Sequence, residues 1–321
     1  MIAEFLKLVE AEIKHQPFGA QPKSLYEPIR YIMSLGGKRL RPLLVMMAYF
    51  LYKKDVKPIV KYAAAVEAFH NFTLLHDDIM DNAPLRRGKP TVHEKWNVNT
   101  AILSGDVMLV KVYEMFLGLD GDTLKKVLSL FNQCAAEVCE GQQWDMEFES
   151  NPKVTESQYI EMIRLKTAVL LGFSLELGAV LAGADESQCR ALKDFGINIG
   201  IGFQLKDDLL DVYGDKKKFG KQVGGDIIAN KKTFLLIKAK EKARGKEKDE
   251  LDYWLKTRKF NKLKKVKAVT ALYDHLHIAQ LTEAKIQFYF DKGFNQLKKI
   301  TDSPSKNALI GFAKELIVRQ T

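Results

Sequence analysis

Apolar residues recur at three- and four-residue steps along most of this chain, which is the spacing of helices that bury one face. The clearest stripe is formed by Ile59, Tyr62, Ala63, Val66, Phe69 and Thr73. Pro58 lies near the start of this helix and Pro84 ends it, because proline cannot continue the backbone hydrogen bonds. The same spacing predicts helices over roughly 4–15, 23–35, 40–51, 97–118, 122–148, 155–183, 187–214 and 228–244, with more after 249.

Other signals are weak or missing. Alternating strand-like runs are scarce, and no linker rich in Ser or Pro and no repeat of fixed period divides the 321 residues. Hydrophobic residues make up 46% of the chain, which is enough for a large core. We therefore predict an all-α fold in which residues 1–321 form a single domain of about ten to thirteen helices.

The sequence also bears on the location of the protein. It contains no apolar run of roughly 18 residues, so we predict no membrane span. The N-terminal segment lacks the basic start and apolar stretch of a signal peptide. Three cysteines, an odd number without the spacing of metal ligands, are typical of reduced thiols. Together these features predict a cytoplasmic protein.

The net charge is +10, which raises the question of nucleic-acid binding. Much of the excess lies between Lys238 and Lys267, where 13 Lys or Arg stand against 5 Asp or Glu. Apolar residues such as Trp254 and Leu255 are set among these lysines, as on an amphipathic helix. A solvated helical face explains this better than a site for a polyanion or a membrane surface. We predict no nucleic-acid partner.

The segment Asp-Asp-Ile-Met-Asp concentrates charge on an otherwise apolar helix. Asp77 and Asp81 lie four residues apart and share one helix face, with Asp78 beside them. Three like charges within about one turn repel and weaken a helix unless something positive lies near them. A solvated helix end would explain the acids, but the apolar neighbours Leu75 and Ile79 argue against it.

The same D-D-x-x-D spacing returns about 130 residues later in Asp207, Asp208 and Asp211, again within an apolar helix. Two carboxylate clusters on facing helices would form a cage of hard oxygens, which suits Mg²⁺ and a substrate phosphate. The pattern argues against zinc, because no His or Cys lies among the acids in ligand spacing.

Cations complete the pattern, since Arg and Lys match phosphate oxygens. They lie in four short stretches and comprise Lys38, Arg39, Arg41, Arg86, Arg87, Lys89, Lys166, Lys221, Lys231 and Lys232. Each stretch alone would be surface as often as function. Together with the paired acidic motifs they predict a site for diphosphates, some bound through Mg²⁺ and some directly.

From about residue 30 to 240 the chain resembles the trans-isoprenyl diphosphate synthases (polyprenyl synthetases), especially the short-chain geranylgeranyl and farnesyl types. The matching segments, in the family's order, are GGKRLRP, EAFHNFTLLHDDIMD, RRGKPTVH, AILSGDVML, EGQQWDM, RLKTA, FQLKDDLLD and GKQVGGDIIANKKT. The resemblance implies an all-helical bundle around a central cavity, usually as a homodimer. It also implies Mg²⁺-dependent head-to-tail condensation of isopentenyl diphosphate with an allylic diphosphate.

The resemblance also implies a role for each candidate residue. Three Mg²⁺ ions would be held by Asp77, Asp81 and Asp207, with their water ligands oriented by Asp78, Asp208 and Asp211. The allylic diphosphate would be contacted by Arg86, Lys166, Lys221 and Lys231. Isopentenyl diphosphate would be bound by Lys38, Arg41, His70 and Arg87. The reacting carbons would be lined by Gln142, Thr167 and Gln204. His76 and Trp144 are expected to be structural, and no metal is expected at His275 or His277.

Product length is expected to depend on Phe72. This residue precedes Asp77 by five positions, or about 7.5 Å along a helix at 1.5 Å per residue. A bulky ring there would act as a floor for the growing chain, although plain core packing also explains it. In the family, an aromatic residue here with an uninterrupted D-D-x-x-D resembles short-chain enzymes. We therefore favour a C20 product, with C15 next and C30 or longer as the alternative.

Other functions remain open on the sequence alone. A class I terpene cyclase would share the first acidic motif, but it normally lacks the second D-D-x-x-D and the isopentenyl diphosphate site. A regulatory subunit of a heteromeric synthase would have lost acidic motifs that are intact here. A nucleic-acid binder would explain only the basic segment.

Overall fold

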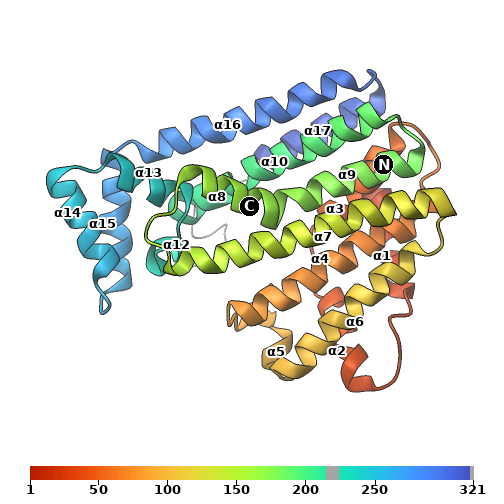
Figure 1. Cartoon of the computed structure of the whole chain (residues 1–321), viewed down its shortest axis with the longest axis horizontal. Coiled ribbons are helices and arrows are strands. Elements are labelled where there is room, and N and C mark those ends of the chain that lie inside the picture. The colour runs from red at the N-terminus through yellow and green to blue at the C-terminus, as the bar shows by residue number, and fades with distance from the viewer. Residues whose placement is uncertain (215–223, 319–321) are drawn as a thin grey trace. The chain divides into compact units, whose positions relative to one another are not determined.

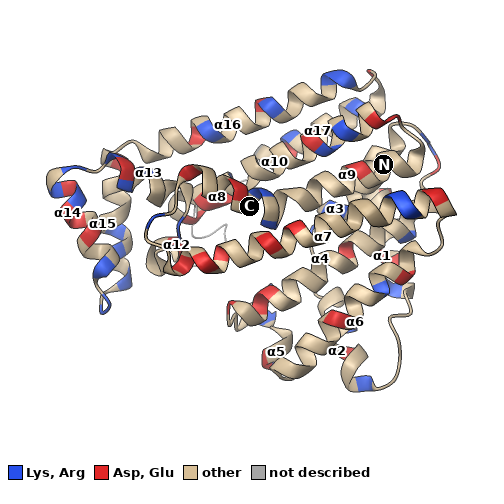
Figure 2. Cartoon of the chain, in the orientation of Figure 1, with Lys and Arg blue, Asp and Glu red and all other residues tan. Residues whose placement is uncertain are grey.

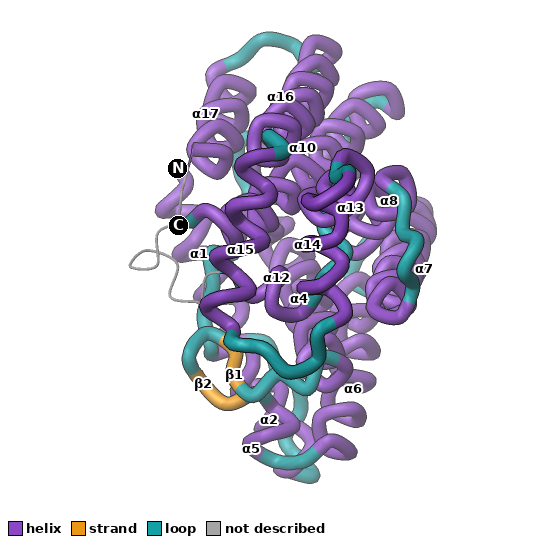
Figure 3. Tube along the Cα trace, turned by 90° about the vertical axis from the view of Figure 1, so that its left-hand side faces the viewer, coloured by secondary structure: helices purple, strands orange, loops and turns teal. Residues whose placement is uncertain are grey.

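The structure is a computed structural model that describes residues 1–214 and 224–318. Helices account for nearly all of its regular structure (Figures 1 and 3), and the one sheet among these residues is a hairpin of β1 (Leu85–Arg86) and β2 (Lys89–Pro90). The predicted all-α fold is confirmed. The α-helices are α1 Ile2–His15, α2 Lys23–Ser34, α3 Leu40–Phe50, α4 Val60–Met80, α5 Val92–Lys95, α6 Val98–Phe116, α7 Gly121–Ser150, α8 Glu156–Ile163, α9 Val169–Ala182, α10 Glu186–Tyr213, α12 Gly225–Ala229, α13 Phe234–Lys242, α14 Gly245–Lys256, α15 Lys262–His275, α16 Ile278–Gln296 and α17 Pro304–Val318.

Internal contacts divide the chain into two compact units. The first comprises Met1–Cys134 and Phe173–Lys193, and the second comprises Ala135–Gly172 and Asp194–Thr321. The boundaries fall within helices and not in linkers. That the whole chain forms one domain stays a prediction.

In the first unit α4 is the central helix. Its buried face is rich in alanine, with Ala63, Ala65 and Ala68 all 0% exposed, and it packs against α6, α3 and α1. Small side chains allow such close packing because they let helix backbones approach. Farther along α4, the ring of Phe69 meets that of Phe131 edge to face at 5.0 Å. This packed helix carries the first acidic motif at its C-terminal end.

A buried arginine ties three parts of the first unit together. Arg39 is 3% exposed and donates to Glu10 at 2.7 Å, to Glu67 at 2.8 Å and to the carbonyl of Met33 at 3.0 Å. Because its donors meet two carboxylates and a carbonyl, its buried charge is compensated. Arg39 therefore fixes the start of α3 against α1 and α4.

In the second unit, hydrogen bonds join the second half of α10 to α8, α12 and α15. α13 packs against α16, α15 and α8, and α12 packs against α15.

One predicted helix is wrong here: the expected helix over 228–244 is two helices, because α12 ends at Ala229 and α13 begins at Phe234. The backbone at Asn230 is left-handed, with φ 56°, which ends α12.

One helical segment, Glu156–Ala182, is long and apolar enough to cross a membrane by length and composition. However, 78% of its most apolar window is buried within the protein, and core helices satisfy the same test. It is therefore weak support for a span.

Candidate active site

The first acidic motif lies at the C-terminal end of α4, where the helix dipole is negative and carboxylates are unfavourable. Asp78 is 2% exposed and accepts two hydrogen bonds of 2.7 Å from Arg86, one from Nε and one from Nη2. Arg86 also lies 3.8 Å from Asp77. The positive group that the spacing of the acids requires is thus the arginine of the hairpin strand β1.

The predicted isopentenyl diphosphate residues Arg41 and His70 are in direct contact. Arg41 Nη1 lies 3.0 Å from His70 Nε2. Because a guanidinium can only donate, Nε2 accepts and the ring proton belongs on Nδ1. Burial lowers the pKa of His70 well below its usual value, and the charge of Arg41 lowers it further. Burial also lowers the pKa of Arg41 to about 10, so at neutral pH Arg41 is charged and His70 is neutral.

Arg87 joins this cluster from the turn between β1 and β2. Its guanidinium donates to the carbonyl of Gly36. The backbone at Gly37 has φ 142°, which favours glycine there, and a Cβ at this position would lie 2.8 Å from Arg87 Nη2. Burial lowers the pKa of Arg87, and its charge contributes to lowering that of Arg41. The fourth predicted member, Lys38, is exposed.

In the second unit Asp208 is the buried member of the second acidic motif. Its two oxygens accept hydrogen bonds from the hydroxyl of Tyr159 and, at 3.0 Å, from Gln204 Nε2. Burial raises the pKa of Asp208 to about 6, against the opposing hydrogen bonds and the charge of Lys231. The Tyr159 side chain was not found by sequence reasoning, because a tyrosine on an apolar helix carries no recognisable signal.

Asp211, at the end of the same motif, holds the start of α12. Its Oδ2 accepts a hydrogen bond of 2.9 Å from the backbone N–H of Asp226. Burial raises the pKa of Asp226 to about 7, with Asp208 and Asp211 adding to the effect and Lys231 opposing it. Sequence reasoning did not single out Asp226 as a candidate, since it is a single acid outside either D-D-x-x-D.

Lys166 and Lys231 share a carboxylate that was also missed. Asp145 Oδ2 lies 2.6 Å from the Nζ of Lys166 and 4.0 Å from that of Lys231. Burial would raise the pKa of Asp145, but the two lysines outweigh burial and hold it below its usual value. The signal was present in the segment EGQQWDM. Lys221, also predicted to bind diphosphate, lies outside the described residues.

The segment Arg164–Ala168 is a single turn of π-helix, a form that is rare and frequent at functional sites. Lys166 and Thr167 both lie in it. A Cβ at Gly141 of α7 would overlap the backbone nitrogen of Lys166, so only glycine allows this approach. Thr167 Oγ1 lies 3.4 Å from Gln204 Oε1. At the next position after Gly141, the side-chain amide nitrogen of Gln142 is buried and has no hydrogen-bond partner among the described residues.

Phe72, the expected floor, is 8% exposed and packs between two rings of α4. Its centroid is 5.6 Å from that of Phe69 and 4.8 Å from that of His76. His76 Nε2 lies 3.3 Å from the carbonyl of Ile102, which fits the structural role expected for it. The ring of Trp144 packs at 6.1 Å from that of Phe148, also as expected of a structural residue.

The acids supply only oxygen donors, which suits a hard cation such as magnesium. Asp77 and Asp81 are one turn apart at the end of α4, and Asp207 lies in α10. Within residues 1–214 and 224–318, no group of three or more His, Cys, Asp or Glu side chains converges as a complete metal site. This donor set fits an ion that retains water and takes further oxygens from a substrate phosphate.

Sequence comparison gives a match to the polyprenyl synthetase family over residues 22–273. The geranylgeranyl pyrophosphate synthase of Geoglobus acetivorans is 39% identical over 99% of both chains. The farnesyl diphosphate synthase of Bacillus subtilis is also 39% identical, over 70% of this chain and 79% of the relative.

Comparison of structures agrees with this match. A crystal structure of a geranylgeranyl pyrophosphate synthase, 42% identical, superposes with a TM-score of 0.92 over 99% of this chain and 98% of the other. A polyprenyl synthase from Caulobacter crescentus CB15, complexed with calcium and isoprenyl diphosphate, is 28% identical and has a TM-score of 0.85 over 99% of this chain and 94% of the other. The family predicted from the eight motifs is confirmed, and the chain belongs to the polyprenyl synthetase family.

Proposed function

We propose that this chain condenses isopentenyl diphosphate with an allylic diphosphate, head to tail, to give a short-chain all-trans prenyl diphosphate. One observation carries this proposal: both D-D-x-x-D motifs are intact in a chain that aligns over 99% of its length with a geranylgeranyl pyrophosphate synthase. The names of the relatives favour a C20 product, with C15 next.

Asp77, Asp81 and Asp207 would hold magnesium, and we propose three ions. The all-oxygen donor set and the calcium complexed by the Caulobacter relative support this proposal. When bound, magnesium would stabilise the charge that develops on the leaving diphosphate. The chain's own contribution is to fix a neighbouring carboxylate in each motif: Arg86 neutralises Asp78, and Tyr159 and Gln204 hold Asp208.

Arg86, Lys166 and Lys231, with Lys221, would contact the allylic diphosphate. Arg86 and the two described lysines are positioned by carboxylates, Arg86 by Asp78 and the lysines by Asp145. A diphosphate carries more charge than either carboxylate and can therefore share these cations. Their pre-set positions reduce the reorganisation that binding would require.

Isopentenyl diphosphate would be bound by Arg41, Arg87 and Lys38, with neutral His70 orienting the guanidinium of Arg41. The allylic C–O bond breaks, the isopentenyl double bond attacks the allylic carbon, and a C2 proton passes to the released diphosphate. No protein base is needed for this proton. The dipoles of Thr167 and Gln204 would face the cationic carbon, with Gln142 completing the lining.

A homodimer is also proposed, and α6 supports it. Three large apolar side chains recur at seven-residue steps along this helix and its C-cap, so they lie on one face: Leu103 is 57% exposed, Val110 55% and Leu117 63%. Such a stripe fits a contact between two copies of the chain. Light scattering should give the mass of a dimer, and Leu103→Lys should shift it toward the monomer.

We further propose that the protein acts in the cytoplasm, which fits cysteines that form no disulfide among the described residues.

The catalytic test is mass analysis of the products formed from Mg²⁺, isopentenyl diphosphate and, separately, C5, C10 and C15 allylic diphosphates. Products that stop at C20 or C15 support the proposal. A C30 or longer product would retain prenyl transfer and reject the chain length. A cyclised hydrocarbon formed without isopentenyl diphosphate would favour a terpene cyclase instead.

A further inference from the structure

One lysine of the basic segment 238–267 departs from the expected solvated face. Lys265 of α15 is 0% exposed. Its ammonium donates to Asn230 Oδ1 at 2.6 Å and to the carbonyl of Ile228 at 3.3 Å, and it lies 4.3 Å from the ring centroid of Phe260. None of these partners is a carboxylate, and burial lowers the pKa of Lys265. A buried ammonium without a counter-charge is costly, so its retention calls for a reason.

Asn230 is the residue that ends α12. It adopts the left-handed conformation, with φ 56° and ψ 34°, which glycine usually supplies at this position. Asn230 is held from both ends of its amide, because Oδ1 accepts from Lys265 and Nδ2 donates to the carbonyl of Leu255 at 3.2 Å. The ammonium of Lys265 also caps the carbonyl end of α12, where positive charge is favourable.

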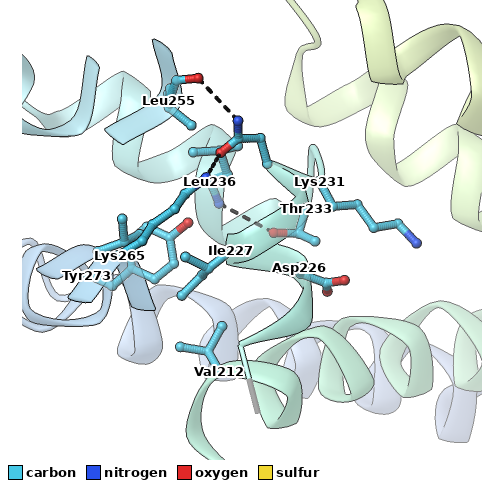
Figure 4. A pocket seen from close by; sticks show the side chains of 11 residues that line it. Val212, Asp226, Ile227, Lys231, Thr233, Leu236, Leu255, Lys265 and Tyr273 are labelled. Atoms are coloured by element: carbon cyan, nitrogen blue, oxygen red, sulfur yellow. Dashed lines mark hydrogen bonds between the residues drawn. The ribbon is translucent and has the colours of Figure 1, made fainter. Parts of the chain in front are cut away.

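This turn sets the direction of the next residue. The backbone N–H of Lys231 donates to the carbonyl of Asp226 at 2.9 Å, closing the turn around Asn230. Figure 4 shows the side chains of Lys231 and Asp226 extending to one side of the turn, while those of Lys265 and Tyr273 lie on the other. Lys231 thereby reaches within 4.0 Å of Asp145, the carboxylate that it shares with Lys166.

We propose that Lys265 is a positioning residue for Lys231. By fixing the left-handed turn at Asn230, its ammonium directs Lys231 toward the site of the allylic diphosphate, although Lys265 itself touches no substrate. This inference rests on the proposed function, in which Lys231 contacts that diphosphate. It gives the buried member of the basic segment a role distinct from that of its exposed neighbours on α15, whose charges Figure 2 shows.

The test is the affinity of the full chain for geranyl diphosphate in Mg²⁺, measured by titration calorimetry. Lys265→Met removes the donor but keeps the length of the side chain, and Lys264→Met at the exposed neighbouring position is the matched control. We expect Lys265→Met to weaken binding at least tenfold, and Lys264→Met to leave it unchanged. The KM for isopentenyl diphosphate should not move. Equal affinity of Lys265→Met and the unmodified chain would overturn the proposal.

A double-mutant cycle separates positioning from a general loss of structure. If Lys265 acts through Lys231, then Lys265→Met should cause no further loss of affinity in a Lys231→Ala background. The same loss in both backgrounds would overturn the proposal. Should Lys265→Met not fold, Asn230→Ala removes both side-chain hydrogen bonds and disfavours the left-handed turn. It should show the same tenfold loss, and unchanged binding would again overturn the inference.

The design also distinguishes this inference from the proposed function. A chain that binds geranyl diphosphate but forms no longer product would contradict the proposed reaction, while the variants would still decide the role of Lys265. A chain that does not bind geranyl diphosphate at all would overturn both.

Discussion

Replacing Asp226 by Asn should stabilise the protein at alkaline pH when no metal or diphosphate is present. The carboxylate of Asp226 is buried near Asp208 and Asp211, and burial, followed by their charges, raises its pKa from 3.8 to about 7. Among the described residues, none donates a hydrogen bond to the carboxylate oxygens of Asp226. Asn has nearly the same shape as Asp. The substitution therefore removes a charge that the fold disfavours without breaking a hydrogen bond that a described residue donates to the side chain.

The raised pKa sets both the size and the pH window of the effect. A shift of about 3 units at 1.36 kcal/mol per unit corresponds to about 4 kcal/mol, and partial solvent exposure reduces the expected gain to about 2–3 kcal/mol. A group whose folded-state pKa is raised contributes its stability below the unfolded-state pKa and loses it as the pH rises. The advantage of Asp226→Asn should therefore be near zero at pH 4, grow up to about pH 7 and stay constant above it.

Urea unfolding followed by circular dichroism, with EDTA present, measures this difference at pH 4.5 and pH 8. Asp249→Asn, at an exposed position of α14, is the matched control and should leave the unfolding free energy unchanged at both values. A variant that is less stable than the unmodified chain at pH 8 would refute the electrostatic argument. So would a gain of the same size at both pH values, because that gain could not come from the ionisation of Asp226.

The other predictions concern turnover, product and packing. Asp77→Ala should lower kcat/KM at least ~100-fold, about 3 kcal/mol of transition-state stabilisation, in a condensation assay with Mg²⁺; near-normal turnover would contradict the metal role. Phe72→Ala should lengthen the products seen by mass analysis, and an unchanged distribution would place the floor elsewhere. Gly141→Ala should destabilise the fold by about 1–3 kcal/mol in urea unfolding, because the new methyl group meets the backbone of Lys166; unchanged stability would show that α7 can move away.

Much of the fold and part of the site could be predicted from local spacing. The predicted helix over 187–214 is α10, which spans Glu186–Tyr213, because a long helix leaves a strong 3.6-residue pattern. The repulsion among the acids of the first motif predicted a nearby positive group, and Arg86 supplies it. Both inferences depend on residues that are close in sequence, so the chain alone contained the necessary information.

The features that could not be predicted depend on tertiary contacts. The π-helical turn at Arg164–Ala168 adjoins α7 at Gly141, and no spacing within the turn reveals it. The break at Asn230 follows from a left-handed residue held by Lys265, which lies 35 positions away. Likewise, a run of charged residues such as 238–267 predicts a solvated helical face. The burial of Lys265 within that run depends on the elements that cover this residue in the folded chain.

The candidate residues of the two units differ in charge, and this difference bears on how each group would work. In the first unit the cations Arg41, Arg86 and Arg87 are as numerous as the acids of the first motif, and Arg86 already neutralises Asp78. In the second unit the candidate cations Lys166 and Lys231 are outnumbered by five acids, Asp145, Asp207, Asp208, Asp211 and Asp226. The raised pKa values of Asp208 and Asp226 are the consequence of burial together with this excess of negative charge.

This excess of negative charge means that a cation should bind to the acids of the second unit before an anion such as a diphosphate can bind near them. Isopentenyl diphosphate, by contrast, would meet arginines that need no metal. We therefore expect magnesium to be required for the allylic diphosphate and dispensable for isopentenyl diphosphate. Calorimetric titration of each diphosphate, with Mg²⁺ and with EDTA, should show this asymmetry. Equal loss of both affinities in EDTA would mean that the metal also organises the arginine cluster around His70.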